Sequence, residues 1–258
     1  MKKSLGQNFL IDLNIIKKII NLVNIKSKNI IEIGPGKGAL TDEIIKKNPK
    51  SLLLIEKDDN LFKELNKRFS NKKEIKIFNA DILKFNMEKN IKKYSIIFGN
   101  LPYNISSQIL VKILRFNKWP PNFTDIIFMF QKELAEKIIA EYPSSNYGRL
   151  SILSSFRLNV IKKFLVSPNC FFPKPKINSM IIHLKPKKEK ILKFRKVTNL
   201  EKITNILFSN KRKMINKNIK KILSKKKIES IDGLKLHLRP ANLKPEIYYK
   251  ITELFEKK

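Results

Sequence analysis

The chain has 258 residues, and its 55 Lys and Arg residues against 22 Asp and Glu residues give a formal net charge of +33. This length suits one large domain, or a large and a small domain. The charge favours a polyanionic partner over a small-molecule substrate alone. The single cysteine, Cys170, excludes an intramolecular disulfide, and the isolated His183 and His237 lack metal-ligand spacing. We therefore expect no metal.

The sequence contains no run of eighteen apolar residues, and the first residues, Met1-Lys2-Lys3-Ser4, are not followed by an apolar signal region. We therefore expect a soluble, cytoplasmic protein with no membrane partner. We also expect it to be a monomer.

Strands and helices alternate in chain order, as judged from the hydrophobic pattern. Asp12 precedes a first helix, whose apolar residues recur at helical spacing as far as Val23. Buried strands are then predicted, with helices between them, at 29–33, 51–55, 74–78, 94–99 and 124–130. Such alternation indicates a parallel sheet covered on both faces. The runs 160–166 and 179–184 have no long helix between them, and we expect them to close the sheet as an antiparallel hairpin.

Three of the predicted strands end in residues suited to holding a nucleoside. The first runs into a glycine-rich turn at 34–38, which begins with Gly34 and does not follow the G-x-G-x-x-G pattern of dinucleotide enzymes. The second ends in Glu56, placed to accept hydrogen bonds from ribose hydroxyls. Asp81 follows the third and can accept from an adenine amino group. A nucleoside pocket without a phosphate-binding loop fits S-adenosylmethionine better than NAD or ATP.

The fourth strand runs into Asn100-Leu101-Pro102-Tyr103. The Asn100 side-chain oxygen and the carbonyl of Leu101 or Pro102 can accept both hydrogens of an exocyclic amine, while Tyr103 stacks on the ring of a flipped base. The alternative is an ordinary turn, because Asn-x-Pro is common turn chemistry. Phe171 is a second candidate for stacking, and it can equally be a core residue.

Composition becomes basic and helical after residue 186, so we predict a catalytic domain at 1–186 and a helical, basic RNA-binding domain at 187–258. The stretch 208–227 holds nine Lys or Arg residues and no acid, which favours phosphate contact over a merely solvated face or compositional drift. The expected RNA contacts are Lys211, Arg212, Lys213, Lys217, Lys220 and Lys221.

The motifs together resemble the ribosomal RNA adenine N6,N6-dimethyltransferase family, and most closely its bacterial small-subunit (16S) branch. The resemblance covers the chain from Leu5 to about Phe255. The motifs that carry it are residues 5–10, 32–36, Glu56, Asp81, 100–103, 128–133, 147–151, 171–177, 208–213 and 239–243.

This resemblance implies a Rossmann-like S-adenosylmethionine-dependent methyltransferase sheet with a small, all-helical C-terminal domain. It implies dimethylation of N6 on two adjacent adenosines in the 3'-terminal hairpin of 16S rRNA within an immature 30S particle, with a role in small-subunit biogenesis. The family's cofactor-binding pattern carries over to Asn8, Leu10, Gly34, Glu56, Asp81 and Asn100.

Two alternatives remain open. A large-subunit rRNA adenine dimethylase shares the catalytic residues but is not expected to have the 239–243 motif. The other alternative is an RNA-binding ribosome assembly factor in which methylation is secondary.

The chain also departs from relatives at two points: only Lys2 and Lys3 precede the first motif, and Lys57 is the middle residue of the Glu56-Lys57-Asp58 triplet. We expect the Lys57 side chain to point away from the ribose.

Overall fold

The computed structural model describes residues 8–188 and 196–257, so Lys2, Lys3 and residues 5–7 of the first motif lie outside the described residues. The described residues form two compact units. The first comprises those up to Lys112 together with Pro120–Ala135 and Val160–Pro186. The second comprises Ile113–Trp119, Glu136–Asn159 and those from Lys187 onward. The last segment of the second unit therefore begins at the predicted domain boundary. That residues 1–186 and 187–258 are separate functional domains stays a prediction.

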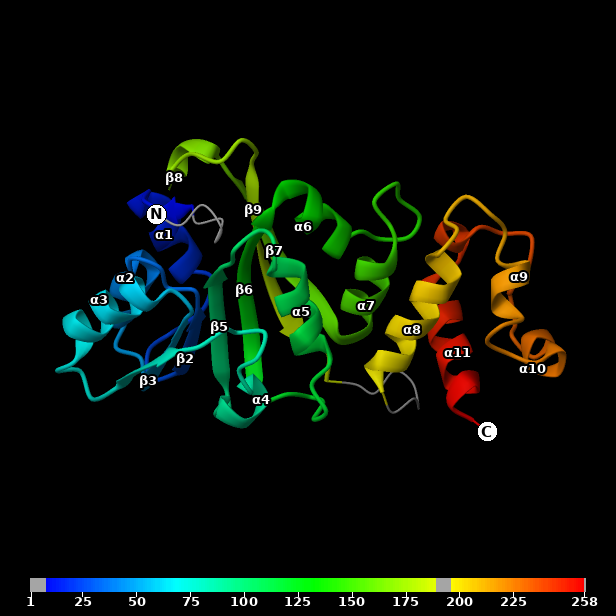
Figure 1. Cartoon of the computed structure of the whole chain (residues 1–258), viewed down its shortest axis with the longest axis horizontal. Coiled ribbons are helices and arrows are strands. Elements are labelled where there is room, and N and C mark those ends of the chain that lie inside the picture. The colour runs from blue at the N-terminus through cyan, green and yellow to red at the C-terminus, as the bar shows by residue number, and fades with distance from the viewer. Residues whose placement is uncertain (1–7, 189–195, 258) are drawn as a thin grey trace. The chain divides into compact units, whose positions relative to one another are not determined.

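A seven-stranded sheet forms the centre of the first unit, in the order β4-β3-β2-β5-β6-β9-β7 (Figure 1). Pairing is parallel from β4 to β6, and β9 runs antiparallel to β6. The predicted alternation and the closing pair of strands are thus confirmed as an α/β, Rossmann-like fold. The strands are β2 Asn29–Ile33, β3 Ser51–Glu56, β4 Ile75–Asn79, β5 Ser95–Asn100, β6 Phe123–Gln131, β7 Leu158–Val166 and β9 Ser179–Pro186.

The strand order has a functional consequence. Because β2 lies between β3 and β5, the direction in which successive strands are added reverses beside β2. Open α/β sheets bind ligands at such a switch point, outside the carboxyl ends of the strands. Gly34, Glu56 and Asn100 all lie at the carboxyl ends of β2, β3 and β5.

Capping residues fix where two helices of this unit begin. Asp12 Oδ1 accepts hydrogen bonds from the backbone N–H groups of Asn14 and Ile15 at 2.9 and 3.0 Å, as predicted for the first helix. Asp58 caps α3 in the same way. The first helix ends earlier than the pattern to Val23 indicates. The helices are α1 Leu13–Ile20, α2 Ala39–Ile45, α3 Asp59–Phe69, α4 Met87–Asn90, α5 Ser106–Leu114 and α6 Lys132–Ile138.

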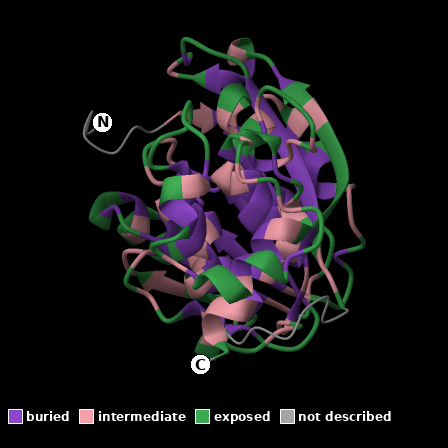
Figure 2. Ribbon diagram, turned by 90° about the vertical axis from the view of Figure 1, so that its right-hand side faces the viewer, coloured by how far each residue is buried: buried purple, intermediate pink, exposed green. Residues whose placement is uncertain are grey.

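One hydrophobic core packs α1, α2 and α3 against a face of the sheet. It includes Ile16 of α1, Ile44 of α2 and Leu65 of α3, together with strand residues such as Phe98 and Met129. Residues that alternate with these along each strand point to the opposite face. Figure 2 shows the central strands of the sheet largely buried and many exposed residues on loops and the outer turns of helices, whereas the edge strand β7 is mostly exposed.

A second, two-stranded sheet joins the start of the described chain to the segment after β7. Its strands are β1 Phe9–Leu10 and β8 Phe171–Phe172, and they pair Phe9 with Phe172 and Leu10 with Phe171. The Ile11 N–H donates to the Cys170 carbonyl at 2.9 Å and extends the pairing. Two motifs that are far apart in sequence therefore lie side by side.

In the second unit, three helices contact one another: α7 Arg149–Arg157, α8 Val197–Phe208 and α11 Pro245–Glu256. The rings of Phe208 and Tyr248 stack at 5.8 Å between centroids, and Arg115 forms a bidentate ion pair with Glu201 at 2.9 and 2.7 Å. The shorter helices are α9 Asn216–Ile219 and α10 Lys225–Glu229. The described residues after Pro186 are helical, without a strand, as the sequence predicts.

Candidate active site

A cavity of about 500 Å³ opens at the carboxyl ends of β2, β3 and β5. This volume lies within the range of small-molecule sites, about 300–1,000 Å³. The structure brings nine of the predicted site residues into its lining. They are Asn8, Leu10, Gly34, Glu56, Asp81, Asn100, Leu101, Pro102 and Tyr103.

The glycine-rich turn brings backbone close to this cavity. Gly36 has a φ of +58°, and a Cβ atom there would lie 3.0 Å from the ring of Phe9. The turn therefore needs glycine at this position for both its conformation and its space. Arg68 of α3 supports the turn: its guanidinium donates to the Lys37 carbonyl at 2.9 Å and pairs with Asp42.

Glu56 is held by three backbone donors. Its Oε1 accepts from the N–H groups of Lys57 and Asp58, both at 2.8 Å, and its Oε2 accepts from that of Gly36 at 3.1 Å. Burial raises the pKa of the Glu56 carboxyl above its ordinary value, and these three hydrogen bonds oppose the rise. The carboxylate is fixed in orientation at the end of β3, and because Oε1 accepts two of these bonds and Oε2 only one, Oε2 keeps a lone pair for a further donor.

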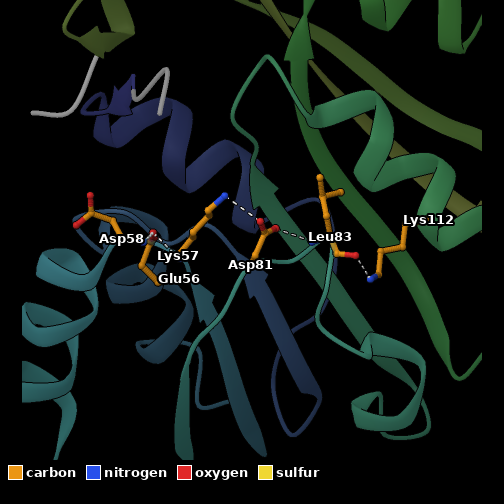
Figure 3. A network of polar contacts seen from close by, with 6 residues as sticks. All are labelled: Glu56, Lys57, Asp58, Asp81, Leu83 and Lys112. Atoms are coloured by element: carbon orange, nitrogen blue, oxygen red, sulfur yellow. Dashed lines mark hydrogen bonds and ion pairs between the residues drawn. The ribbon is translucent and has the colours of Figure 1, made fainter. Parts of the chain in front are cut away.

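Asp81 takes part in a chain of polar contacts that crosses the ends of β3 and β4 (Figure 3). Its Oδ1 accepts from the Leu83 N–H at 2.9 Å and its Oδ2 accepts from Lys57 Nζ at 2.8 Å. The Leu83 carbonyl in turn accepts from Lys112 Nζ at 2.6 Å. The Lys57 ammonium lowers the pKa of Asp81 below its ordinary value. The Lys57 side chain lines the cavity and reaches Asp81, and its expected direction away from the ribose stays a prediction.

The Asn100 amide is oriented by the segment before the first helix. Asn100 Nδ2 donates to the Asn8 carbonyl at 3.0 Å, which fixes Oδ1 as the acceptor atom of this amide.

Tyr103 is held by two serines. The Tyr103 hydroxyl lies 2.6 Å from Ser179 Oγ, and the Tyr103 carbonyl accepts from Ser106 Oγ at 3.1 Å. Sequence reasoning missed Ser179, since nothing in the sequence indicates a contact over this separation.

Phe171 is the one predicted catalytic residue outside the cavity lining. It is 3% exposed and packs in the hydrophobic core, which favours the core alternative in this conformation. Its neighbour Phe172 is 62% exposed. Adjacent residues of a strand point in opposite directions, so only one of the two rings can face the core. A stacking role for Phe171 stays a prediction.

A buried acid, Glu32, also lines the cavity, and sequence reasoning gave it no role. It is 1% exposed, and its Oε2 accepts from Thr41 Oγ1 at 2.7 Å. Desolvation by burial raises the pKa of Glu32 to about 8, and the neighbouring charges of Asp42 and Glu56 add to the rise. The available signal was an acid in the middle of an apolar strand.

The predicted RNA contacts lie in the second unit. All six side chains, Lys211, Arg212, Lys213, Lys217, Lys220 and Lys221, are exposed. Lys227, which belongs to the same basic stretch, is half-buried instead and donates to the carbonyls of Leu254, at 2.8 Å, and Lys257. The six exposed cations are therefore available to phosphates, whereas Lys227 holds the end of α11.

The described residues contain no group of three or more His, Cys, Asp or Glu side chains that could hold a metal ion. In the same part of the chain, none of the helices is long and apolar enough to cross a membrane.

The donor set fits S-adenosylmethionine. Glu56 ends β3 and Asp81 follows the neighbouring strand β4, so two carboxylate acceptors line the cavity at the carboxyl edge of the sheet. The Rossmann-like fold and this site define an S-adenosylmethionine-dependent methyltransferase.

Comparisons with known proteins agree with this assignment to the methyltransferases. A family model described as ribosomal RNA adenine dimethylase matches residues 1–257. The chain is 47% identical to ribosomal RNA small subunit methyltransferase A of Pelagibacter ubique, over 99% of this chain and 97% of that one. It is 40% identical to the protein of the same name from Malacoplasma penetrans, over 96% and 90%. The chain therefore belongs to the ribosomal RNA adenine dimethylase family, which confirms the resemblance found in the sequence.

Two solved structures are similar over nearly the whole chain. A dimethyladenosine transferase from Plasmodium falciparum has a TM-score of 0.78 at 27% identity, covering 94% of this chain and 95% of that one. The 23S rRNA methyltransferase ErmE has a TM-score of 0.70 at 24% identity, covering 96% and 100%, and this second likeness bears on the fold alone.

Proposed function

We propose that this protein dimethylates N6 of two adjacent adenosines in the 3'-terminal hairpin of 16S rRNA, and that S-adenosylmethionine is the methyl donor. The observation that carries the proposal is the orientation of the Asn100 amide. Its nitrogen donates to the Asn8 carbonyl, so the amide oxygen is left as an acceptor in the cavity that Tyr103 also lines. The names of the relatives, ribosomal RNA small subunit methyltransferase A, support the small subunit over the large one as substrate.

The chemistry required follows from the adenine amine. Its lone pair is delocalised into the ring, which makes N6 a poor nucleophile. Asn100 Oδ1 and the carbonyl of Leu101 or Pro102 accept both N–H hydrogens, and this draws N6 toward tetrahedral geometry and localises the lone pair. Tyr103 stacks on the extruded base and holds it in line. When bound, S-adenosylmethionine supplies the methyl group from a sulfonium that is already a good leaving group. The proton displaced from N6 passes to water after the transfer, so no side-chain base is invoked.

The remaining cavity residues position the donor. Glu56 accepts from the ribose hydroxyls and Asp81 from the adenine amino group. Gly34 allows the turn to approach closely, and Asn8 and Leu10 complete the pocket before α1. We also propose that the reaction uses no metal.

The second substrate is a large polyanion, and exposed cations suit it. Lys211, Arg212 and Lys213, with Lys217, Lys220 and Lys221, neutralise phosphates of small-subunit rRNA in an immature 30S particle. Residues 187–258 act as the RNA-binding domain. We further propose that the protein is a cytoplasmic monomer and that this binding also serves small-subunit biogenesis.

The test uses purified protein, labelled S-adenosylmethionine and small subunits whose RNA lacks the terminal-hairpin modification. After digestion of the RNA, the labelled nucleosides are identified. We expect N6,N6-dimethyladenosine with the wild type and a loss of at least 100-fold in rate with Asn100→Ala, the size typical of removing one aligned hydrogen-bonding group. Asn205→Ala, an exposed asparagine of α8, is the control and keeps the full rate. Small-subunit RNA that stays unlabelled, while large-subunit RNA in a parallel reaction is labelled, would contradict the substrate assignment.

A further inference from the structure

The hydroxyl of Tyr103 makes a contact that neither the fold nor the proposed chemistry requires. It lies 2.6 Å from Ser179 Oγ, and the two residues are 76 positions apart in the chain. Ser179 is the first residue of β9 and is 0% exposed. Tyr103 follows β5, and β6 lies between β5 and β9 in the sheet. The hydrogen bond therefore spans the carboxyl end of β6, where Gln131 pairs with Ser179.

The same tyrosine is also held at its backbone. Its carbonyl accepts from Ser106 Oγ at 3.1 Å, and Ser106 is the fully buried first residue of α5. One buried serine thus fixes the main chain of Tyr103, and another fixes the far end of its ring. A tyrosine ring has two side-chain torsions, and anchoring the hydroxyl restricts both of them.

Burial raises the pKa of Tyr103 above its ordinary value, so the phenol keeps its proton throughout the physiological range and remains able to donate. Ser179 Oγ has lone pairs that can accept a hydrogen bond from the phenol. Because Ser179 is completely buried, an unmade hydrogen bond there would leave polar atoms without a solvent partner. The pair therefore favours one ring orientation.

We propose that Ser179 is a positioning residue for the target base: its hydroxyl holds the Tyr103 ring at the orientation in which an extruded adenine stacks. This inference rests on the proposed function, because Tyr103 is the stacking residue there. Ser179 itself touches no reacting atom. The Ser179 hydroxyl disfavours those orientations of the Tyr103 ring that would leave the adenine amine out of line with the methyl donor. Such alignment matters because a small misplacement of a reacting group lowers the rate by a large factor.

A double-mutant cycle tests the coupling. Ser179→Ala, Tyr103→Phe and the double variant are compared in single-turnover methylation of unmodified small subunits. We expect each single variant to be about tenfold slower, as removal of one positioning group predicts, and the double variant to be no slower than either. Binding of S-adenosylmethionine and of the particle stays within about twofold of wild type, so the effect is on the rate and not on affinity.

The matched control is Ser95→Ala. Ser95 is likewise the first residue of a strand, β5, is 1% exposed, and donates from its hydroxyl to the Lys92 carbonyl at 2.7 Å. It lies at the amino end of its strand, away from the cavity. A general effect of removing a buried serine hydroxyl would slow both alanine variants alike, whereas the positioning role slows only Ser179→Ala.

A second measurement is independent of activity. The ring signals of selectively labelled tyrosines are followed by NMR, and Tyr103→Phe identifies the Tyr103 signal among the six tyrosines. We expect slow ring motion in the wild type and faster motion in Ser179→Ala. An unchanged Tyr103 signal, a wild-type rate for Ser179→Ala, or rate effects that multiply in the double variant would each overturn the inference. A wild type that fails to methylate small subunits would contradict the proposed function, while the ring signal still decides whether Ser179 anchors Tyr103.

Discussion

Lys57 Nζ lies 2.8 Å from Asp81 Oδ2 and joins the residue after β3 to the residue that follows β4 by two positions. Both side chains line the cavity, so the cation is a direct neighbour of the acceptor proposed for adenine. The ammonium lowers the pKa of the Asp81 carboxyl below its ordinary value. The cavity therefore contains a carboxylate acceptor that is paired with a neighbouring cation.

Replacing Lys57 with alanine is expected to raise the pKa of Asp81 toward its ordinary value of 3.8. A lowered native pKa contributes stability that is present above the unfolded pKa and is lost as the pH falls through the native one. Lys57 is exposed and Asp81 is half-buried, so solvent screens the pair and the variant loses at most about 1 kcal/mol at neutral pH. An NMR titration of the Asp81 carboxyl measures the shift. Lys63→Ala, an exposed lysine of α3, is the control, and equal titration curves for Lys57→Ala and wild type would contradict the prediction.

Glu32→Gln is expected to stabilise the protein increasingly as the pH rises. The native protein keeps the Glu32 proton up to about pH 8, whereas the unfolded chain releases it near the ordinary pKa of 4.5. Between these values the unfolded state binds fewer protons, so this group lowers stability as the pH rises. Glutamine can still accept from Thr41 and has no proton to release.

Thermal unfolding of both proteins between pH 5 and pH 8.5 tests the Glu32 prediction. The difference in melting temperature, variant minus wild type, should grow up to about pH 8 and then level off. Parallel curves over the whole interval would show that Glu32 does not retain its proton.

Gly36→Ala is expected to destabilise the protein and to abolish binding of S-adenosylmethionine. Alanine at a positive φ costs about 1–2 kcal/mol, and its Cβ would also approach the Phe9 ring to 3.0 Å. Gly233→Ala is a matched control, since Gly233 has a φ of +72° and a Cβ added there would meet no atom within 4 Å. It should show the backbone cost alone and leave cofactor binding intact. Equal effects of the two substitutions, measured by calorimetry of binding and unfolding, would remove the steric part of the explanation.

Substituting Lys211, Arg212 and Lys213 together with glutamine is expected to weaken binding to unmodified small subunits and to reduce its salt dependence. The slope of log affinity against log salt should fall by about 1 for each phosphate that is no longer neutralised. The control is a triple glutamine substitution of the exposed Lys72, Lys73 and Lys92 in the first unit, which gives the two triple variants the same net charge. Identical slopes for the two triple variants would indicate that net charge alone, and not this basic segment, drives binding.

The sequence predicted the sheet closely because its strands are short apolar runs bounded by turn residues. The strand at 29–33 was placed at its observed bounds, since β-branched residues are followed at once by Gly34. Asn100 and Glu56 were found for the same reason: a polar residue ending a buried strand has few structural uses. The closing pair, β7 and β9, followed from the absence of a helix between two apolar runs.

What the sequence could not predict depends on side-chain direction and on contacts between distant residues. The pattern gives no way to decide which of Phe171 and Phe172 is buried, because a two-residue strand has no periodicity to count. The reach of Lys57 to Asp81 depends on a flexible side chain, and the contact of Tyr103 with Ser179 joins positions that only the sheet order brings together. Local pattern likewise gave no sign that residues 113–119 and 136–159 cluster with the C-terminal segment.

Mapping the methyl groups on small-subunit RNA is the most direct test of the proposed activity. Unmodified particles are incubated with the protein and S-adenosylmethionine, and the 3'-terminal RNA fragment is isolated and sequenced by mass spectrometry. We expect two methyl groups on N6 of each of two adjacent adenosines in the terminal hairpin, and none when Asn100 is replaced by alanine. Methylation at any other site, or a terminal hairpin that stays unmodified while the protein binds S-adenosylmethionine, would contradict the proposed activity.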